Sequence, residues 1–290
     1  MQTVTPSRYA RETIAKLLKQ FITYEPGVRA NKDMEPLHQM RVTSRRLRNA
    51  FWVFKGLFPA KVLKESQNNI RAFGRVLGRA RDLDVKIEFL KELQSAVRNI
   101  ARRSEVVKLT LILRKKRARF QPSVLAALDQ LYKKGVLGKI EGMLTAASIE
   151  KGPEAQRLYC VAEKKILKRL NRFLQYEAYV YKPKRVKELH QMRIAAKHLR
   201  YTLESFAPLY GKATHKFIKQ VMAIQGYLGE VHDFDAWKNS LNDFTAANFL
   251  KNTCEHYKEQ GYKNFVRTWE KSKQQKIFEQ LAGFIRRELH

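Results

Sequence analysis

Histidine and basic side chains recur at three- and four-residue spacing in two segments of the chain. The first set, here called the first ridge, is His38, Arg41, Arg45 and Arg48; the second ridge is His190, Arg193, Lys197 and Arg200. Residues at this spacing lie along one face of an α-helix. A guanidinium group donates two parallel hydrogen bonds to a phosphate and keeps its charge at physiological pH. Both ridges are therefore candidate sites for phosphate groups.

The histidine at the start of each ridge admits several interpretations. An imidazole has an ordinary pKa of about 6.5, so it can become cationic beside a polyanion. It could also pack beneath the arginines, coordinate a metal or act as a catalytic nucleophile. No HxxxH or HxxE pattern adjoins His38 or His190, and the spacing supplies no partner acid for catalysis. We therefore expect these histidines to bind anions without a metal or another cofactor.

The charge of the ridges distinguishes them from an ordinary solvated surface. Like charges at this spacing repel each other, and residues 38–55 contain no Asp or Glu that would offset the repulsion. A solvated helix face usually mixes both signs, whereas position and sign are kept in both ridges. This pattern favours an anion-binding site.

Further basic residues near the ridges extend the candidate site. They are Arg46, Arg71 and Arg75 in the first half, and His198, Lys216 and Lys219 in the second. The first half also carries Arg79 and Arg81, where the second has Glu230 and His232. We therefore expect the two halves to contribute unequal positive charge.

The ridges belong to a duplicated sequence. LHQMRVTSRRLRNAFWVFKGLF at residues 37–58 matches LHQMRIAAKHLRYTLESFAPLY at residues 189–210, and LGRARDLD at residues 77–84 matches LGEVHDFD at residues 228–235. Two matching blocks in the same order indicate a duplication with a period of domain size. The KGP sequence near Glu150–Pro153 breaks the helical pattern. We therefore expect two helical bundles, residues 1–150 and 151–290.

Helical periodicity runs through nearly every long segment, and most prolines lie between such segments, which predicts an all-α protein. Helices are expected at about 7–24, 34–57, 60–78, 81–99, 104–134, 153–178, 184–207, 212–228, 231–249 and 252–289, with a break near Pro122. The short connections imply antiparallel neighbours. An apolar stripe beside each ridge, from Leu37 to Phe58 and from Leu189 to Tyr210, predicts the buried face.

The LGxxxD blocks are interpreted as structural. Gly78 and Gly229 are expected near helix ends, with Asp82 and Asp233 in the first turn of the next helix. The DxD pattern that each aspartate begins could hold Mg²⁺, but this pattern alone is a weak indication, and helix capping explains the first aspartate.

The whole chain is strongly basic. Its 290 residues include 58 Lys+Arg and 27 Asp+Glu, which gives a net charge of +31 and a pI near 10.2. Such an excess predicts a polyanionic partner, which could be a nucleic acid, an anionic membrane surface or a polyphosphate. A content of 44% apolar residues argues against disorder, and two cysteines fit a reducing compartment. With no membrane span or signal peptide in the sequence, we expect a cytoplasmic protein that does not enter a membrane.

Motifs of common enzyme classes are absent from the sequence. It contains no GxxxxGK[ST] loop, GxSxG, HExxH or paired-cysteine zinc motif, which favours a binding protein over an enzyme. Binding of nucleic acid is an alternative, although the ridges lack interleaved aromatic residues for base stacking. The other alternative is a metal-binding protein or a phosphohydrolase that uses His38 or His190.

The combined motifs resemble the CHAD family, the conserved histidine α-helical domain. The resemblance rests on HxxRxxxRRLR at residues 38–48, HxxRxxxKHLRY at residues 190–201 and the LGxxxD blocks, and it extends from about Ser7 to the C-terminus. It implies two helical bundles related by pseudo-twofold symmetry, whose basic helices line a central channel or cleft that binds inorganic polyphosphate. It further implies association with polyphosphate granules. Because the bundles occupy all 290 residues, no fused triphosphate-processing domain is expected.

Overall fold

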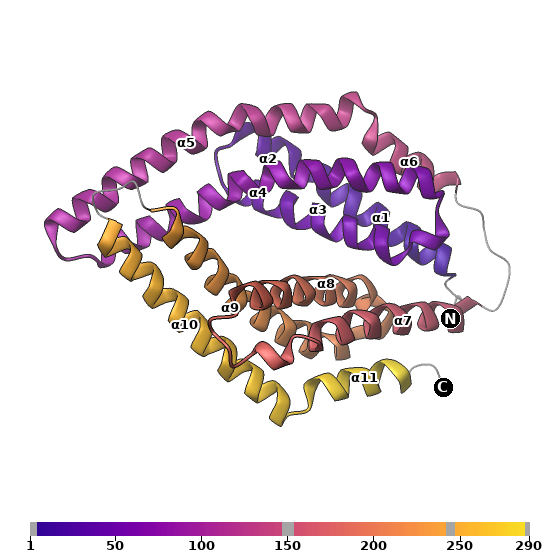
Figure 1. The fold of residues 1–290 in the computed structure, drawn as a ribbon. Helices are drawn as coiled ribbons and strands as arrows, with labels where there is room; N and C mark the ends of the chain where they lie inside the picture. The colour runs from indigo at the N-terminus through magenta and orange to yellow at the C-terminus, as the bar shows by residue number, and fades with distance from the viewer. Residues whose placement is uncertain (1–4, 147–153, 242–246, 288–290) are drawn as a thin grey trace. The chain divides into compact units, whose positions relative to one another are not determined.

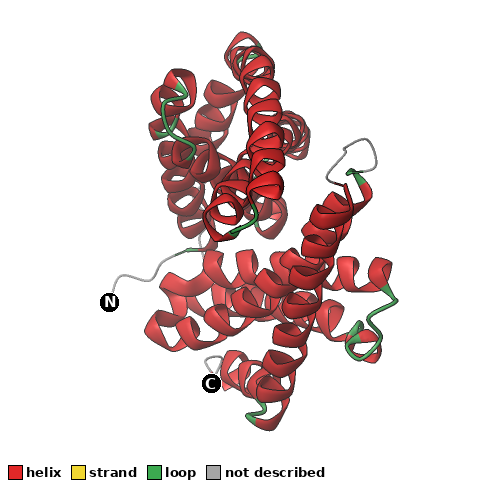
Figure 2. Cartoon of the chain, turned by 90° about the vertical axis from the view of Figure 1, so that its left-hand side faces the viewer, coloured by secondary structure: helices red, strands yellow, loops and turns green. Residues whose placement is uncertain are grey.

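The computed structural model describes residues 5–146, 154–241 and 247–287, and this part of the chain forms helices and turns without a strand (Figure 2). The predicted all-α class is confirmed. The chain divides into two compact units, Met1–Gly152 and Pro153–His290. The sequence position expected to separate them, Glu150–Pro153, lies outside the described residues. None of the described helices is both long enough and apolar enough to cross a membrane.

The first unit contains six α-helices and one short 3-10 helix in its described part (Figure 1). They are α1 (Pro6–Thr23), α2 (Glu25–Ala30), α3 (Glu35–Val53), η1 (Lys55–Leu57), α4 (Ala60–Ala96), α5 (Ile100–Lys133) and α6 (Val136–Ala146). Helix α3, which carries the first ridge, packs against α1 and α4, and α4 packs against α5. Helix α4 therefore lies between the helix that carries the first ridge and α5.

The described part of the second unit contains five α-helices and two 3-10 helices. They are α7 (Glu154–Leu174), η2 (Glu177–Tyr179), α8 (Val186–Tyr210), η3 (Gly211–Thr214), α9 (His215–Asn239), α10 (Ala247–Gln274) and α11 (Ile277–Arg287). Helix α8, which carries the second ridge, packs against α7 and α9, and α9 packs against α10. The order of contacts thus repeats that of the first unit.

The apolar stripes predicted beside the ridges form the cores of the two units. Every stripe position is buried: Leu37, Met40, Ser44, Leu47, Phe51, Phe54 and Phe58 in the first unit, and Leu189, Met192, Ala196, Leu199, Leu203, Phe206 and Tyr210 in the second. Complete burial of a large apolar side chain contributes about 1.5–3 kcal/mol, so these stripes fix the rotation of α3 and α8 about their axes. The adjacent ridges consequently lie at the edge of each core.

Two predicted helix boundaries beside the site are wrong. Helix α4 continues through Gly78, and α9 continues through Gly229, so residues 60–99 and 212–239 do not divide at these glycines. Neither glycine has a positive φ angle. A glycine inside a helix costs only about 1 kcal/mol relative to alanine, less than packing along a long helix supplies. Asp82 and Asp233 are therefore mid-helix residues and cap nothing.

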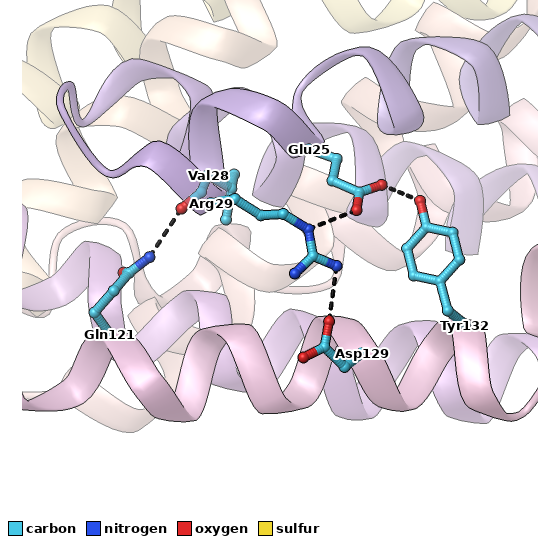
Figure 3. Close-up of polar contacts among 6 residues, drawn as sticks. All are labelled: Glu25, Val28, Arg29, Gln121, Asp129 and Tyr132. Carbon is cyan, nitrogen blue, oxygen red and sulfur yellow. Dashed lines mark hydrogen bonds and ion pairs between the residues drawn. The ribbon is translucent and has the colours of Figure 1, made fainter.

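The predicted break at Pro122 is also wrong, because α5 is continuous from Ile100 to Lys133. Contacts from α2 hold α5 on both sides of the proline (Figure 3). Gln121 Nε2 donates a hydrogen bond of 2.8 Å to the carbonyl oxygen of Val28, and Arg29 Nη2 lies 2.7 Å from Asp129 Oδ1. Such contacts offset the backbone hydrogen bond that proline cannot donate.

The C-terminal prediction of one helix over 252–289 is wrong as well. Helix α10 ends at Gln274, and α11 begins at Ile277 after Lys276, which has a left-handed φ of 49°. The turn lets the apolar face of α11 fold back onto α7, where Phe278 contacts Phe173 with ring centroids 5.5 Å apart. The predicted helix over 231–249 is also wrong, because α9 ends at Asn239 and residue 249 belongs to α10. Residues 242–246 and 288–289 lie outside the described part.

Candidate anion-binding site

The two ridges are partly buried rather than fully solvated. All eight side chains are intermediate in exposure; the side chain of Arg41 is 18% exposed and that of Arg193 is 15% exposed. Each ridge lies one helical position beyond the apolar stripe, so its side chains emerge between their own helix and the next one. The structure therefore places each set of cations along one helix–helix boundary within its own unit.

In the first unit Arg41 lies across α4, against Gly78 and beside Asp82. A Cβ atom at Gly78 would lie 3.6 Å from Nε of Arg41, which is van der Waals contact, so a larger side chain would displace the guanidinium group. Nη2 of Arg41 is 3.8 Å from Oδ1 of Asp82. The glycine thus leaves space for the arginine, and the aspartate one turn later attracts it.

The second unit repeats this arrangement with Arg193, Gly229 and Asp233. A Cβ atom at Gly229 would lie 3.6 Å from Nη1 of Arg193, and the same nitrogen is 3.5 Å from Oδ1 of Asp233. The two repeated sequence blocks therefore act together: one supplies the arginine, and the other supplies the glycine and aspartate that position it. Sequence reasoning missed this coupling, although the equal Gly-x-x-x-Asp spacing in both copies was a signal for it.

The second aspartate of each DxD pattern forms an ion pair with a basic residue of another helix. Oδ1 of buried Asp84 is 2.8 Å from Nε of Arg117 on α5, and Oδ1 of Asp235 is 2.8 Å from Nζ of Lys258 on α10. Each DxD pattern thus joins three helices through two separate cations. The described residues contain no group of three or more potential metal ligands.

Cations from α3 and α4 gather in the first unit. The pKa of Arg48 is lowered by burial and then by the charges of Arg71, Arg45 and Arg75. Nε of Arg48 is buried and has no hydrogen-bond partner among the described residues. Arg71 and Arg75 are exposed at the surface. Concentrated positive charge with an unsatisfied donor suits an anionic ligand.

The second unit offers fewer cations around the corresponding residue, Arg200. Glu204 Oε1 lies 3.4 Å from Nε of Arg200, and this pair has no equivalent in the first unit, where Trp52 occupies the matching position. The positions on α9 that match Arg71, Arg75 and Arg79 are Met222, Gly226 and Glu230. The expected inequality of charge between the halves is thus present around the ridges themselves.

The remaining predicted residues lie around the ridges with different orientations. Arg46 and His198 occupy matching positions, about 100° around the helix from Arg45 and Lys197. Lys219 is exposed on α9. Lys216 Nζ donates a hydrogen bond of 3.1 Å to Oε1 of Gln280, so the structure connects Lys216 to α11. Arg46 and His198 therefore lie outside the helix faces that form the ridges, and Lys216 bonds to α11.

His38 and His190 are partly buried at the start of the ridges. Nδ1 of each is buried without a hydrogen-bond partner in the described part of the chain. Burial lowers the pKa of His38, and the charge of Arg81 on α4 lowers it further. Burial lowers the pKa of His190 to about 4, followed by the effect of His232 on α9. Both imidazoles are therefore neutral near pH 7.

Arg81 and His232 act on the two ridge histidines, although sequence reasoning left both out of the candidate set. The ring of His232 contacts that of His190, with centroids 4.0 Å apart and planes inclined by 41°. Burial also lowers the pKa of His232. The alignment of the two LGxxxD blocks, in which His232 matches Arg81, was the sequence signal that could have identified both residues. The pKa of each ridge histidine is thus lowered by one basic side chain from the neighbouring helix, Arg81 for His38 and His232 for His190.

Comparisons with known proteins identify relatives of this chain. A family model described as CHAD domain matches residues 12–242. The crystal structure of the CHAD domain from the plant Ricinus communis is similar at 24% sequence identity and a TM-score of 0.64, covering 98% of this chain and 92% of that one. PptA from Streptomyces chartreusis is similar at 12% identity and a TM-score of 0.63, covering 92% and 99% respectively. No curated protein sequence matches the chain.

Proposed function

Since this chain belongs to the CHAD domain family, we propose that it binds inorganic polyphosphate through the first and second ridges and catalyses no reaction on it. Polyphosphate is the ligand that the family resemblance implies. One observation carries the proposal. In each unit a partly buried arginine, Arg41 or Arg193, lies against a glycine and beside an aspartate of the next helix, which together position its guanidinium group. Preorganised guanidinium groups of this kind recognise phosphate oxygens.

The dimensions of the ridges suit a linear polymer. From His38 to Arg48 the helix rises over ten steps, about 15 Å along α3, and the matching residues span the same length along α8. A single phosphate can contact only part of such a row, whereas consecutive phosphates of one chain can contact several of its cations. We therefore expect long polyphosphate to bind more tightly than a short triphosphate.

Electrostatic attraction dominates this proposed interaction. Neutralising a polyanion with Arg and Lys side chains releases condensed counterions, so affinity falls steeply as salt concentration rises. The net charge of +31 adds a general field that brings polyanions to the protein. A chain that binds polyphosphate in this way would associate with cytoplasmic polyphosphate granules.

A competition titration tests the choice of ligand. Long-chain polyphosphate, RNA, duplex DNA and tripolyphosphate are titrated at equal phosphate concentration over a series of salt concentrations. The proposal expects polyphosphate to bind most tightly and to resist displacement by RNA or DNA. Displacement of polyphosphate by either nucleic acid would instead support a nucleic-acid-binding protein, whose present support is net charge alone. Phosphate release in the presence of Mg²⁺ or Mn²⁺ would contradict the non-catalytic role.

A further inference from the structure

The second ridge differs from the first in a way that bears on its regulation. We propose that the second ridge is a proton-linked polyphosphate site, in which His190 and His232 take up protons when polyphosphate binds. This inference rests on the proposed function. It assigns to His232 a binding role beside His190. It also predicts that proton uptake on polyphosphate binding occurs mainly at the second ridge, which contains this histidine pair.

The geometry brings two titratable rings together at the boundary of α8 and α9. The ring centroids of His190 and His232 are 4.0 Å apart, and both side chains are partly buried. Nδ1 of His190 is buried without a hydrogen-bond partner among the described residues. Two adjacent imidazolium groups repel each other, so near neutral pH an anion beside the rings is needed to favour the form in which both are charged.

The groups around the pair keep both rings neutral in the absence of a ligand. Arg193 and Lys197 lower the pKa of each ring, and Asp233 acts in the opposite direction. Asp235 raises the pKa of His232 only, and it is already paired with Lys258 of α10 at 2.8 Å. Burial is the largest effect on both rings, and together with the neighbouring charges it lowers the pKa of His190 to about 4.

The first ridge has a permanent cation where the second has this titratable ring. Arg81 occupies the position on α4 that His232 occupies on α9, and its charge lowers the pKa of His38. Nη2 of Arg81 also lies 3.6 Å from Oε2 of Glu88. An arginine stays protonated at every relevant pH, so the first ridge carries this charge before a ligand arrives. The second ridge gains the equivalent charge only by protonation of His232.

A bound polyphosphate chain changes this balance. Its negative charge stabilises the imidazolium forms, which donate N–H groups to phosphate oxygens, and the added protons come from the solvent. Between the pKa values of the free and the bound protein, binding therefore takes up protons, and affinity increases as pH falls. The increase is up to about tenfold per pH unit for each proton taken up.

Calorimetry measures this proton uptake directly. Long-chain polyphosphate is titrated into the protein at pH 6.5 in two buffers that differ in ionisation enthalpy, and the difference in heat gives the number of protons bound. The expected uptake by the unmodified protein exceeds that of His232→Arg by about one proton. The reciprocal variant Arg81→His is the matched control, and it should increase uptake by introducing a titratable ring into the first ridge.

The outcomes separate this inference from the proposed function. Tight binding with equal proton uptake by the unmodified protein and His232→Arg would overturn the inference alone. Absence of binding at every pH would overturn both. A second measurement needs no variant: in NMR titrations without ligand, the two rings should titrate below the ordinary histidine pKa of about 6.5, and polyphosphate should raise their pKa values. Rings that titrate at about 6.5 without ligand would contradict the inference.

Discussion

Arg41 packs its guanidinium group against Gly78, at a distance where a Cβ atom would already be in van der Waals contact with Nε. Arg193 and Gly229 have the same relationship in the other unit. This contact explains why both sequence blocks recur together in the chain, since the arginine of α3 or α8 depends on the surface of α4 or α9. The ridges are thus positioned by pairs of helices.

Substituting the glycine should disturb binding without removing any charge. In Gly78→Leu the new side chain displaces Arg41 from α4, and we expect polyphosphate affinity to fall about three- to tenfold, equivalent to roughly 0.7–1.4 kcal/mol. Gly78→Ala should bind nearly as well as the unmodified protein, because one methyl group makes only ordinary contact. Gly142→Leu is the matched control, since nothing lies within 4 Å of its Cβ position. Unchanged affinity in Gly78→Leu would contradict the positioning role.

Removal of the exposed carboxylate at Asp82 distinguishes anion binding from metal binding. Asp82 attracts Arg41 across 3.8 Å, but its charge opposes an approaching polyanion. Exposed ion pairs contribute about 0–1 kcal/mol, so we expect Asp82→Asn to increase polyphosphate affinity by about two- to fivefold at low salt. If the DxD pattern instead bound Mg²⁺ needed for polyphosphate, the same substitution would weaken binding, and added Mg²⁺ would strengthen binding to the unmodified protein.

The buried pair between Asp84 and Arg117 should matter for stability. Removal of one member leaves an uncompensated buried charge, so Arg117→Met is expected to lower the free energy of unfolding by about 3–5 kcal/mol. Lys139→Ala removes a partner of the exposed pair with Glu65, which is 2.6 Å long, and should cost less than about 1 kcal/mol. Urea denaturation measures both. Equal losses of unfolding free energy in the two variants would show that the buried Asp84 pair stabilises the fold no more than an exposed pair does.

The partly buried histidines should make the ligand-free protein sensitive to acid. Their pKa values are lower in the folded protein than the ordinary value of about 6.5, so the unfolded chain binds more protons below that pH. Their contribution to stability is full above about pH 6.5 and is lost as pH falls toward 4. We expect the fall in Tm between pH 7 and 5 to be about 2–4 °C smaller in His190→Asn than in the unmodified protein. An identical fall in both proteins would contradict the depressed pKa of His190.

The helix faces could be predicted from sequence because they depend on local periodicity. The apolar stripe that begins at Leu37 and the ridge that begins at His38 follow the same helical repeat, one residue apart, so assignment of the core also fixed the face that carries the cations. The repeated block at Leu189 gave the same information a second time. These features required no knowledge of which helices pack together.

The helix breaks and the partners of the aspartates could not be predicted in the same way. Gly78 and Pro122 are weak local signals, and packing of α4 and α5 over their whole length outweighs them. Asp84 and Arg117 are 33 positions apart in sequence, so they come into contact only when α4 and α5 pack together. The contact of His190 with His232 likewise arises from the packing of α8 on α9.

The central claim is that the ridges, and not the general positive charge, bind polyphosphate. It is tested most directly by reversing four ridge charges in one variant, Arg41→Glu, Arg45→Glu, Arg193→Glu and Arg200→Glu. The matched control carries Arg114→Glu, Lys115→Glu, Lys116→Glu and Arg119→Glu, which are exposed on α5 and change the net charge equally. After circular dichroism establishes that both are folded, binding of long-chain polyphosphate is titrated at low salt. We predict that the ridge variant loses at least about 100-fold in affinity, equivalent to roughly 2.7 kcal/mol, while the control loses less than about fivefold. Equal losses in the two variants would contradict the claim.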